Sequence, residues 1–98
     1  MEITDIVVNL RNEHKLKAFV DITFDDEFII RGLKIINGQT GLFVCMPSRK
    51  LSNGQYKDIA HPVRNDFRVR MEEHILEAYR KELEKPRELR EERDDEQY

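Results

Sequence analysis

The sequence has no tryptophan, only one cysteine, and only three prolines and four glycines among its 98 residues. The single cysteine, Cys45, cannot form an intrachain disulfide, and a lone thiol inside an apolar run favours a reducing compartment. No apolar run approaches the length that crosses a bilayer. The first ten residues, MEITDIVVNL, lack the basic start and long apolar stretch of a secretory signal. We therefore expect a cytoplasmic protein that does not associate with membranes.

Residue patterns that mark an enzyme are also scarce. Cys45, His61 and Asp58 are the ingredients of a thiol nucleophile with its base and orienting carboxylate. A thiol in an apolar strand is, however, more often neutral and buried. The three histidines lack any short metal-ligand spacing, and no glycine-rich phosphate loop is present. We expect no catalysis, no metal, no cofactor and no small-molecule substrate.

What the chain does contain is a series of strand patterns. Residues 15–24 alternate apolar and mostly polar side chains, which is the period of a half-buried strand. Further apolar or β-branched segments predict strands at residues 3–10, 28–37 and 41–46, and a short fifth strand at residues 56–60.

Several positions between and within these strands carry turn or bulge signals. Gly32 in the middle of its strand predicts a bulge or a close approach of another backbone segment. Asn37-Gly38 predicts a tight turn, and Asn53-Gly54 predicts another, within a loop over residues 47–55. Because residues 41–46 form a continuous apolar run, we expect a central strand covered on both faces.

One helix follows the strands. Asn65 and Asp66 are good N-cap residues, and Pro86 limits a helix that we expect to end at about Glu84. At 100° per residue, one face gathers the apolar side chains Phe67, Met71, Ile75, Ala78 and Tyr79.

Three more apolar residues, Val69, Leu76 and Leu83, lie on the adjoining side of this helix. The apolar surface is wider than one sheet requires, so a second subunit would cover it and extend a small core. We predict a homodimer with these residues at its interface. The alternative is a helix sunk deeply into the fold of a single chain.

The expected architecture is one α+β domain over residues 1–84: a small antiparallel β-sheet of four to five strands followed by a C-terminal α-helix, dimeric. Residues 85–98 hold one apolar side chain besides the final tyrosine, so they cannot offset their ordering entropy by burial. We expect this charged tail to be disordered or a frayed extension of the helix.

Charge is distributed unevenly along the chain. The net charge is −3, which disfavours a nucleic-acid partner, but residues 47–70 carry six basic and two acidic side chains, a local charge of +4. Such an island can bind phosphates locally, although ordinary solvated side chains would give the same count. The candidate nucleic-acid-binding residues are Arg49, Lys50, Lys57, Arg64 and Arg68.

An ordered set of residues resembles a known family. The segment GLFVCMPSRK at residues 41–50, followed by Gly54, by DIAHP at residues 58–62 and by Asn65, is similar to the signature of the stage V sporulation protein G family. The resemblance covers roughly residues 1–83. It implies a small dimeric α+β protein that binds DNA and RNA and that regulates sporulation, septation or gene expression.

Two functions remain open. The first is a nucleic-acid-binding regulator of the septation and sporulation type, which acts as a homodimer through a basic loop and the start of the helix. The second is a protein–protein interaction module in cell division, with incidental nucleic-acid binding, and the acidic net charge favours this alternative.

Overall fold

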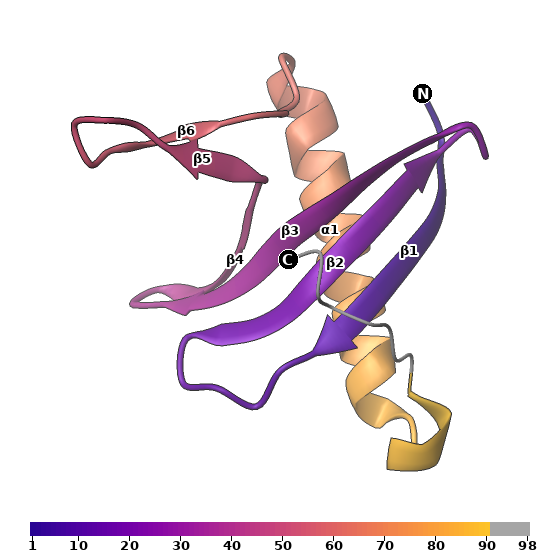
Figure 1. Cartoon of the computed structure of the whole chain (residues 1–98). Coiled ribbons are helices and arrows are strands. Elements are labelled where there is room, and N and C mark those ends of the chain that lie inside the picture. Colours follow the sequence, from indigo (N-terminus) through magenta and orange to yellow (C-terminus); the bar gives the residue numbers. More distant parts are fainter. Residues whose placement is uncertain (91–98) are drawn as a thin grey trace.

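The computed structural model describes residues 1–90, and it confirms the α+β fold (Figure 1). Four strands form one antiparallel sheet in the order β1-β2-β3-β4, and two short strands form a separate ribbon. The elements are β1 (Ile3–Leu10), β2 (Leu16–Phe24), β3 (Phe28–Gly38), β4 (Gly41–Cys45), β5 (Ser48–Lys50), β6 (Tyr56–Asp58), α1 (Asn65–Glu84) and a 3-10 turn, η1 (Arg87–Leu89).

Helix α1 lies across one face of the sheet, and the core fills the space between these two layers (Figure 1). The predicted helix face is confirmed, because Met71, Ile75 and Tyr79 are buried at intervals of one turn. The alternating pattern of β2 points Val20 and Ile22 at the helix, and both are completely buried. Periodicity in the sequence therefore determines which residues form the core.

Strand β3 contains the predicted bulge. Val20 pairs with Leu33 and Ile22 with Ile30, so Arg31 and Gly32 together oppose the single residue between Val20 and Ile22. Gly32 has a φ of +83°, a conformation that only glycine adopts without strain.

Strand β4 lies at the edge of the sheet, so the prediction of a central strand was wrong. Val44 faces α1 and is buried, but Leu42 and Phe43 are 39% and 44% exposed. A continuous apolar run predicts cover on both faces, and within residues 1–90 only the helix side provides it.

The tight turn predicted at Asn37-Gly38 also differs. Gly38 opposes Gly41, so the chain reverses at Gln39 and Thr40. Gly38 instead lies against the ring of Phe43, where an added Cβ would come within 2.7 Å of a ring carbon. Glycine at position 38 therefore allows the Phe43 ring to lie close to the backbone, and it does not form the turn itself.

The fifth strand was predicted over residues 56–60 as part of the main sheet. The structure instead pairs β6 with β5 in a hairpin that projects away from the sheet (Figure 1). Strand β5 lies inside the segment that was predicted to be a loop. Three residues are too few to give a strand signal in the sequence.

The bounds of α1 agree with the prediction, but its N-cap does not. The N-cap residue is Arg64, with no capping hydrogen bond from its side chain, and Asn65 and Asp66 are the first residues of the helix. Pro86 follows the helix end, as expected. Of the predicted tail, residues 85–90 include η1, and residues 91–98 lie outside the described residues. Within residues 1–90, no helix is both long and apolar enough to cross a membrane.

Candidate nucleic-acid interface

The β5–β6 hairpin carries three of the five predicted nucleic-acid-binding residues. Three pairs build it: Ser48 opposite Asp58, Arg49 opposite Lys57, and Lys50 opposite Tyr56. All six residues are exposed. Side chains alternate between the faces of a strand pair, so Arg49 and Lys57 project together from one face of the hairpin. The structure thus brings together two cations that lie eight positions apart in the sequence.

Short-range bonds fix the loop of this hairpin. Leu51 and Gln55 close it through an N–H···O bond of 2.6 Å, and Gly54 donates to the carbonyl of Leu51 at 3.0 Å. The side-chain oxygen of Asn53 accepts from the amide of Gln55 at 3.0 Å, and Gly54 has a φ of +89°. The turn prediction for Asn53-Gly54 is confirmed. The Asn53 side chain is occupied inside the turn, so it is less suited to contact a ligand.

A groove of about 790 Å³ lies at the point where the chain leaves the sheet for the hairpin. Its wall includes Arg68 from the first turns of α1, together with Arg31 and Lys34 from β3. The hairpin contributes Ser48, Tyr56 and Asp58. Three cations and one carboxylate therefore border this groove, which favours an anionic ligand.

Cys45 also lines the groove, opposite Lys34 in the β3–β4 ladder. Burial raises the pKa of the Cys45 thiol; the charge of Lys34 lowers it, and that of Asp58 raises it further. The thiol is therefore protonated at neutral pH. His61, the third residue of the possible catalytic set, hydrogen-bonds the Pro62 carbonyl oxygen through Nδ1 at 2.9 Å, and it lines a different, mostly apolar groove.

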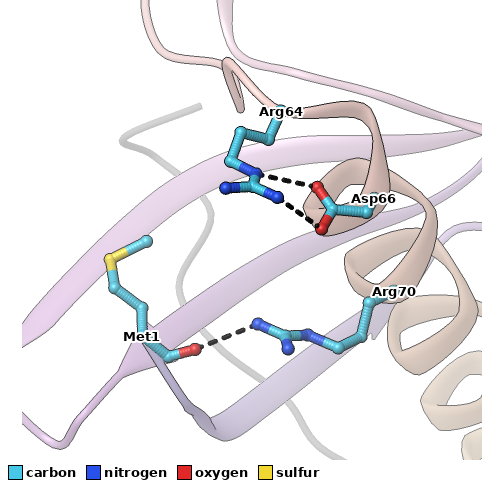
Figure 2. A network of polar contacts seen from close by, with 4 residues as sticks. All are labelled: Met1, Arg64, Asp66 and Arg70. Atoms are coloured by element: carbon cyan, nitrogen blue, oxygen red, sulfur yellow. Dashed lines mark hydrogen bonds and ion pairs between the residues drawn. The ribbon is translucent and has the colours of Figure 1, made fainter.

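Arg64 does not join the hairpin cations. Its guanidinium donates two hydrogen bonds of 3.1 Å to the carboxylate of Asp66 (Figure 2). This contact holds the pKa of the Asp66 carboxyl below its usual value. Arg70 is also engaged, because it donates to the Met1 carbonyl oxygen at 3.1 Å (Figure 2). Its guanidinium also lies over the ring of Phe67. At the start of the helix, Arg68 is therefore the cation placed to contact an anion in the groove. Arg64 could contact an anion only after its ion pair with Asp66 breaks.

The three residues predicted at a dimer interface lie on an outward flank of α1. Val69 and Leu83 are each 46% exposed, and Leu76 is half-buried. Val69 and Leu76 share a shallow groove with Glu72, Glu73, Glu77 and Arg80. Leu76 also packs against the buried core, whereas Val69 and Leu83 are left largely to solvent in the part of the chain that the structure describes.

Arg31 and Lys34 were not among the predicted residues. The sequence argument counted charge along a continuous segment, whereas these two side chains reach the groove from β3, across the strand pairing. The signal that could have found them is the bulge at Gly32, since a bulge redirects neighbouring side chains. No three histidine, cysteine, aspartate or glutamate side chains within residues 1–90 lie close enough to hold a metal ion.

These features define a class of small α+β proteins in which a four-stranded sheet is covered by one helix and a projecting hairpin carries exposed cations. Residues 1–81 match the family model described as SpoVG, and the chain belongs to the SpoVG family. The resemblance deduced from the sequence is confirmed.

Proteins from several bacteria are similar to this chain over most of its length. A protein of Thermoanaerobacter pseudethanolicus is 52% identical over 82 residues, which cover 83% of this chain and 89% of the relative. One from an Anaeromyxobacter species is 53% identical over 85 residues, covering 87% and 88%. One from Clostridium botulinum is 48% identical over 85 residues, covering 86% and 93%. All three bear the name "Putative septation protein SpoVG".

Proposed function

We propose that this chain is a nucleic-acid-binding regulatory protein of the septation and sporulation type, which acts in the cytoplasm as a homodimer and without catalysis. The names of its relatives support the connection to septation. The observation that carries the nucleic-acid proposal is the pairing of Arg49 with Lys57 on an exposed hairpin. Its ligand is DNA or RNA, and no cofactor or small-molecule substrate takes part.

The pairing matters because like charges directly opposite each other destabilise a strand pair. A polyanion removes this repulsion and gains from both cations. Lys50 follows Arg49 on the same strand and, because side chains alternate, projects with Tyr56 from the other face, so the hairpin carries cations on both faces. Phosphate groups, which are spaced regularly along a strand, are suitable ligands.

A groove borders the opposite face of the hairpin, from which Ser48, Tyr56 and Asp58 project. Arg68 and Lys34 approach it from the helix and from β3, and the exposed ring of Tyr56 borders it from the hairpin. Exposed aromatic rings stack on unpaired bases, whereas cations contact the backbone. With so few cations on an acidic protein, we expect modest affinity and a steep dependence on salt.

The experiment is fluorescence anisotropy with labelled 20-nucleotide DNA and RNA, single- and double-stranded, between 50 and 200 mM KCl. In the R49Q/K57Q variant we expect at least roughly tenfold weaker binding and, on duplex DNA, a salt slope smaller by about 1.8. The matched control is R80Q/K81Q, which removes the same charge from the exposed side of α1. Equal losses in both variants would mean that only net charge matters and would refute the hairpin assignment.

A protein-interaction module is the second candidate, and the apolar groove lined by Phe28, Ile59 and Val63 favours it. These three side chains are exposed at one end of the molecule. The same titration separates the two functions. If the wild-type chain retains none of the labelled nucleic acids at 50 mM salt, the nucleic-acid proposal is wrong and this second function takes its place.

A further inference from the structure

We propose that the acidic segment over residues 91–98 docks on the face of the four-stranded sheet opposite α1, and that nucleic acid has to displace it to reach Arg31 and Lys34. We call this surface the open face, because α1 packs on the other side of the sheet (Figure 1). The inference rests on the proposed nucleic-acid function and adds a competitor that the chain itself carries.

The first argument is the charge of the segment. Residues 91–98 carry five acidic side chains and one basic side chain, Arg93, which gives a charge of −4. Because the whole chain has a net charge of −3, residues 1–90 alone carry +1. The segment therefore accounts for all of the net negative charge, and without it the protein would attract a polyanion instead of repelling it.

The second argument is a row of side chains that crosses the open face. Val20 belongs to the core, so its neighbour Phe19 points to the open face. Phe19 opposes Asn9 of β1 and Lys34 of β3, which therefore project from the same face. The guanidinium of Arg11 lies 5.1 Å from the centre of the Phe19 ring. Asn9, Phe19 and Lys34 form what we call the open-face row, and cations lie at both of its ends.

One member of the open-face row is a buried amide that lacks a partner. Asn9 is only 2% exposed, and in the part of the chain that the structure describes neither its amide nitrogen nor its oxygen has a hydrogen-bond partner. A buried amide without partners costs free energy. A peptide segment that lies against this row brings backbone N–H and C=O groups that can bond to both atoms.

The charges of the open face and of the segment match in both signs. Asp21 lies on the same face as Phe19, two residues along β2, and it is also buried. Cations thus surround a single central carboxylate on the face, whereas carboxylates surround a single arginine, Arg93, in the segment. An antiparallel or parallel passage of the segment over the row brings opposite charges together.

The length of the segment is sufficient for this contact. Helix α1 begins beside Met1, whose carbonyl accepts from Arg70, and it runs along β1, so its last turn lies where β1 ends (Figure 1). Arg90 is held there by hydrogen bonds of 3.3 Å to carbonyls at the end of the helix. Two strand spacings, about 10 Å, separate β1 from Lys34 on β3. Eight extended residues span roughly 26 Å, enough to pass round the edge at β1 and reach Lys34.

The contact would withdraw cations from the groove proposed for nucleic acid. Arg31 and Lys34 line that groove together with Phe19, and both cations are exposed. Lys34 forms no ion pair with a carboxylate of residues 1–90. A segment bound to these two side chains leaves Arg68 as the remaining cation of the groove.

The docking is tested on the full chain without nucleic acid. D94N/D95N removes two charges from the segment, and E84Q/E88Q is the matched control at two exposed positions before it. In ¹H–¹⁵N spectra at 50 mM KCl, D94N/D95N should shift the amides of the open-face row, and salt at 500 mM should abolish the difference by screening. An unchanged row, or equal shifts in the control, would overturn the docking. Shifts that scale with protein concentration would assign the face to another copy and overturn it as well.

The competition is tested by anisotropy with the labelled DNA and RNA at 50 mM KCl. D94N/D95N should bind at least about threefold more tightly than the wild type, and E84Q/E88Q less than about twofold. In a K34Q background the gain should shrink, because the segment has lost a cation that it covers. Equal gains in both double variants would overturn the competition. Row shifts without any nucleic-acid binding would support the docking and refute the proposed function, whereas binding without row shifts would do the opposite.

Discussion

Arg49 and Lys57 face each other directly across the β5–β6 hairpin, and both are exposed. The hairpin has only three residue pairs, so this opposition of like charges occupies its central pair. A two-stranded ribbon is marginally stable without support. The repulsion between Arg49 and Lys57 lowers the stability of the free hairpin, and an anion bound between them would remove this repulsion.

Reversing one charge of this pair should separate stability from binding. In Lys57→Glu, the repulsion becomes an attraction worth about 0.2–1 kcal/mol in a cross-strand pair. We expect the hairpin amides to exchange more slowly and nucleic-acid binding to weaken. Hydrogen exchange and anisotropy on the same sample measure both effects. Faster exchange at residues 48–58 would contradict the pairing.

The ion pair at the start of α1 should respond to acid. The Arg64 side chain lowers the pKa of Asp66 below its usual 3.8. A carboxyl whose pKa is depressed in the folded state contributes stability above its unfolded pKa, and this contribution disappears as the pH falls through the folded value. In Arg64→Gln, we expect the pKa of Asp66 to rise towards 3.8, as followed by carboxyl carbon chemical shifts. Arg70→Gln is the control, with a smaller rise because Arg70 is the weakest cause.

The same ion pair should limit the use of Arg64 by a ligand. Asp66→Asn releases the Arg64 guanidinium and removes a negative charge at the start of the helix, so nucleic-acid binding should become tighter. Arg64→Gln should weaken binding less than the hairpin double substitution does. Anisotropy at fixed salt compares the three variants, and a dominant loss in Arg64→Gln would show that the helix start is the main contact.

Cys45 should react slowly with alkylating reagents at neutral pH. Burial raises its pKa, and the thiolate is the reactive form. Replacing Lys34 with glutamine removes a lowering influence, so alkylation should slow further, whereas Asp58→Asn removes a raising influence and should accelerate it. Iodoacetamide kinetics at pH 7–9, with mass spectrometry, give the order of rates. If the Lys34 variant reacted faster and the Asp58 variant more slowly than the wild type, charged groups other than Lys34 and Asp58 would control the reactivity of Cys45.

The core prediction concerns Ile75, which is completely buried between α1 and the sheet. Ile75→Ala should lower the free energy of unfolding by about 2–5 kcal/mol, because it leaves a cavity. Ile59→Ala, at a position that is 67% exposed, should change it by less than about 0.5 kcal/mol. Urea unfolding followed by circular dichroism measures both. Equal effects would mean that α1 does not seal the core.

The sequence alone predicted the elements in which the spacing of apolar residues determines which side chains are buried. The alternation along β2, the bulge at Gly32 and the apolar face of α1 all follow from local spacing, and each is present in the structure. Strand order was not accessible in this way, since a continuous apolar run at residues 41–46 is compatible with either a central or an edge strand.

The candidate site was only partly predictable for the same physical reason. The hairpin cations lie in one segment, so counting charge along the chain found Arg49, Lys50 and Lys57. Arg31 and Lys34 meet Arg68 only through the pairing of β3 with β4 and the packing of α1. The engagement of Arg64 with Asp66 depends on side-chain geometry at the helix start, which residue types alone do not fix.

The amide of Ile59 donates to the carbonyl of Pro47 at 2.8 Å, so the two ends of the hairpin are held side by side. The hairpin therefore leaves and re-enters the rest of the chain at one place, and we expect the segment between these two anchors to be replaceable without a change in the sheet. Grafting the corresponding segment from another SpoVG protein tests whether the proposed nucleic-acid preference moves with the hairpin.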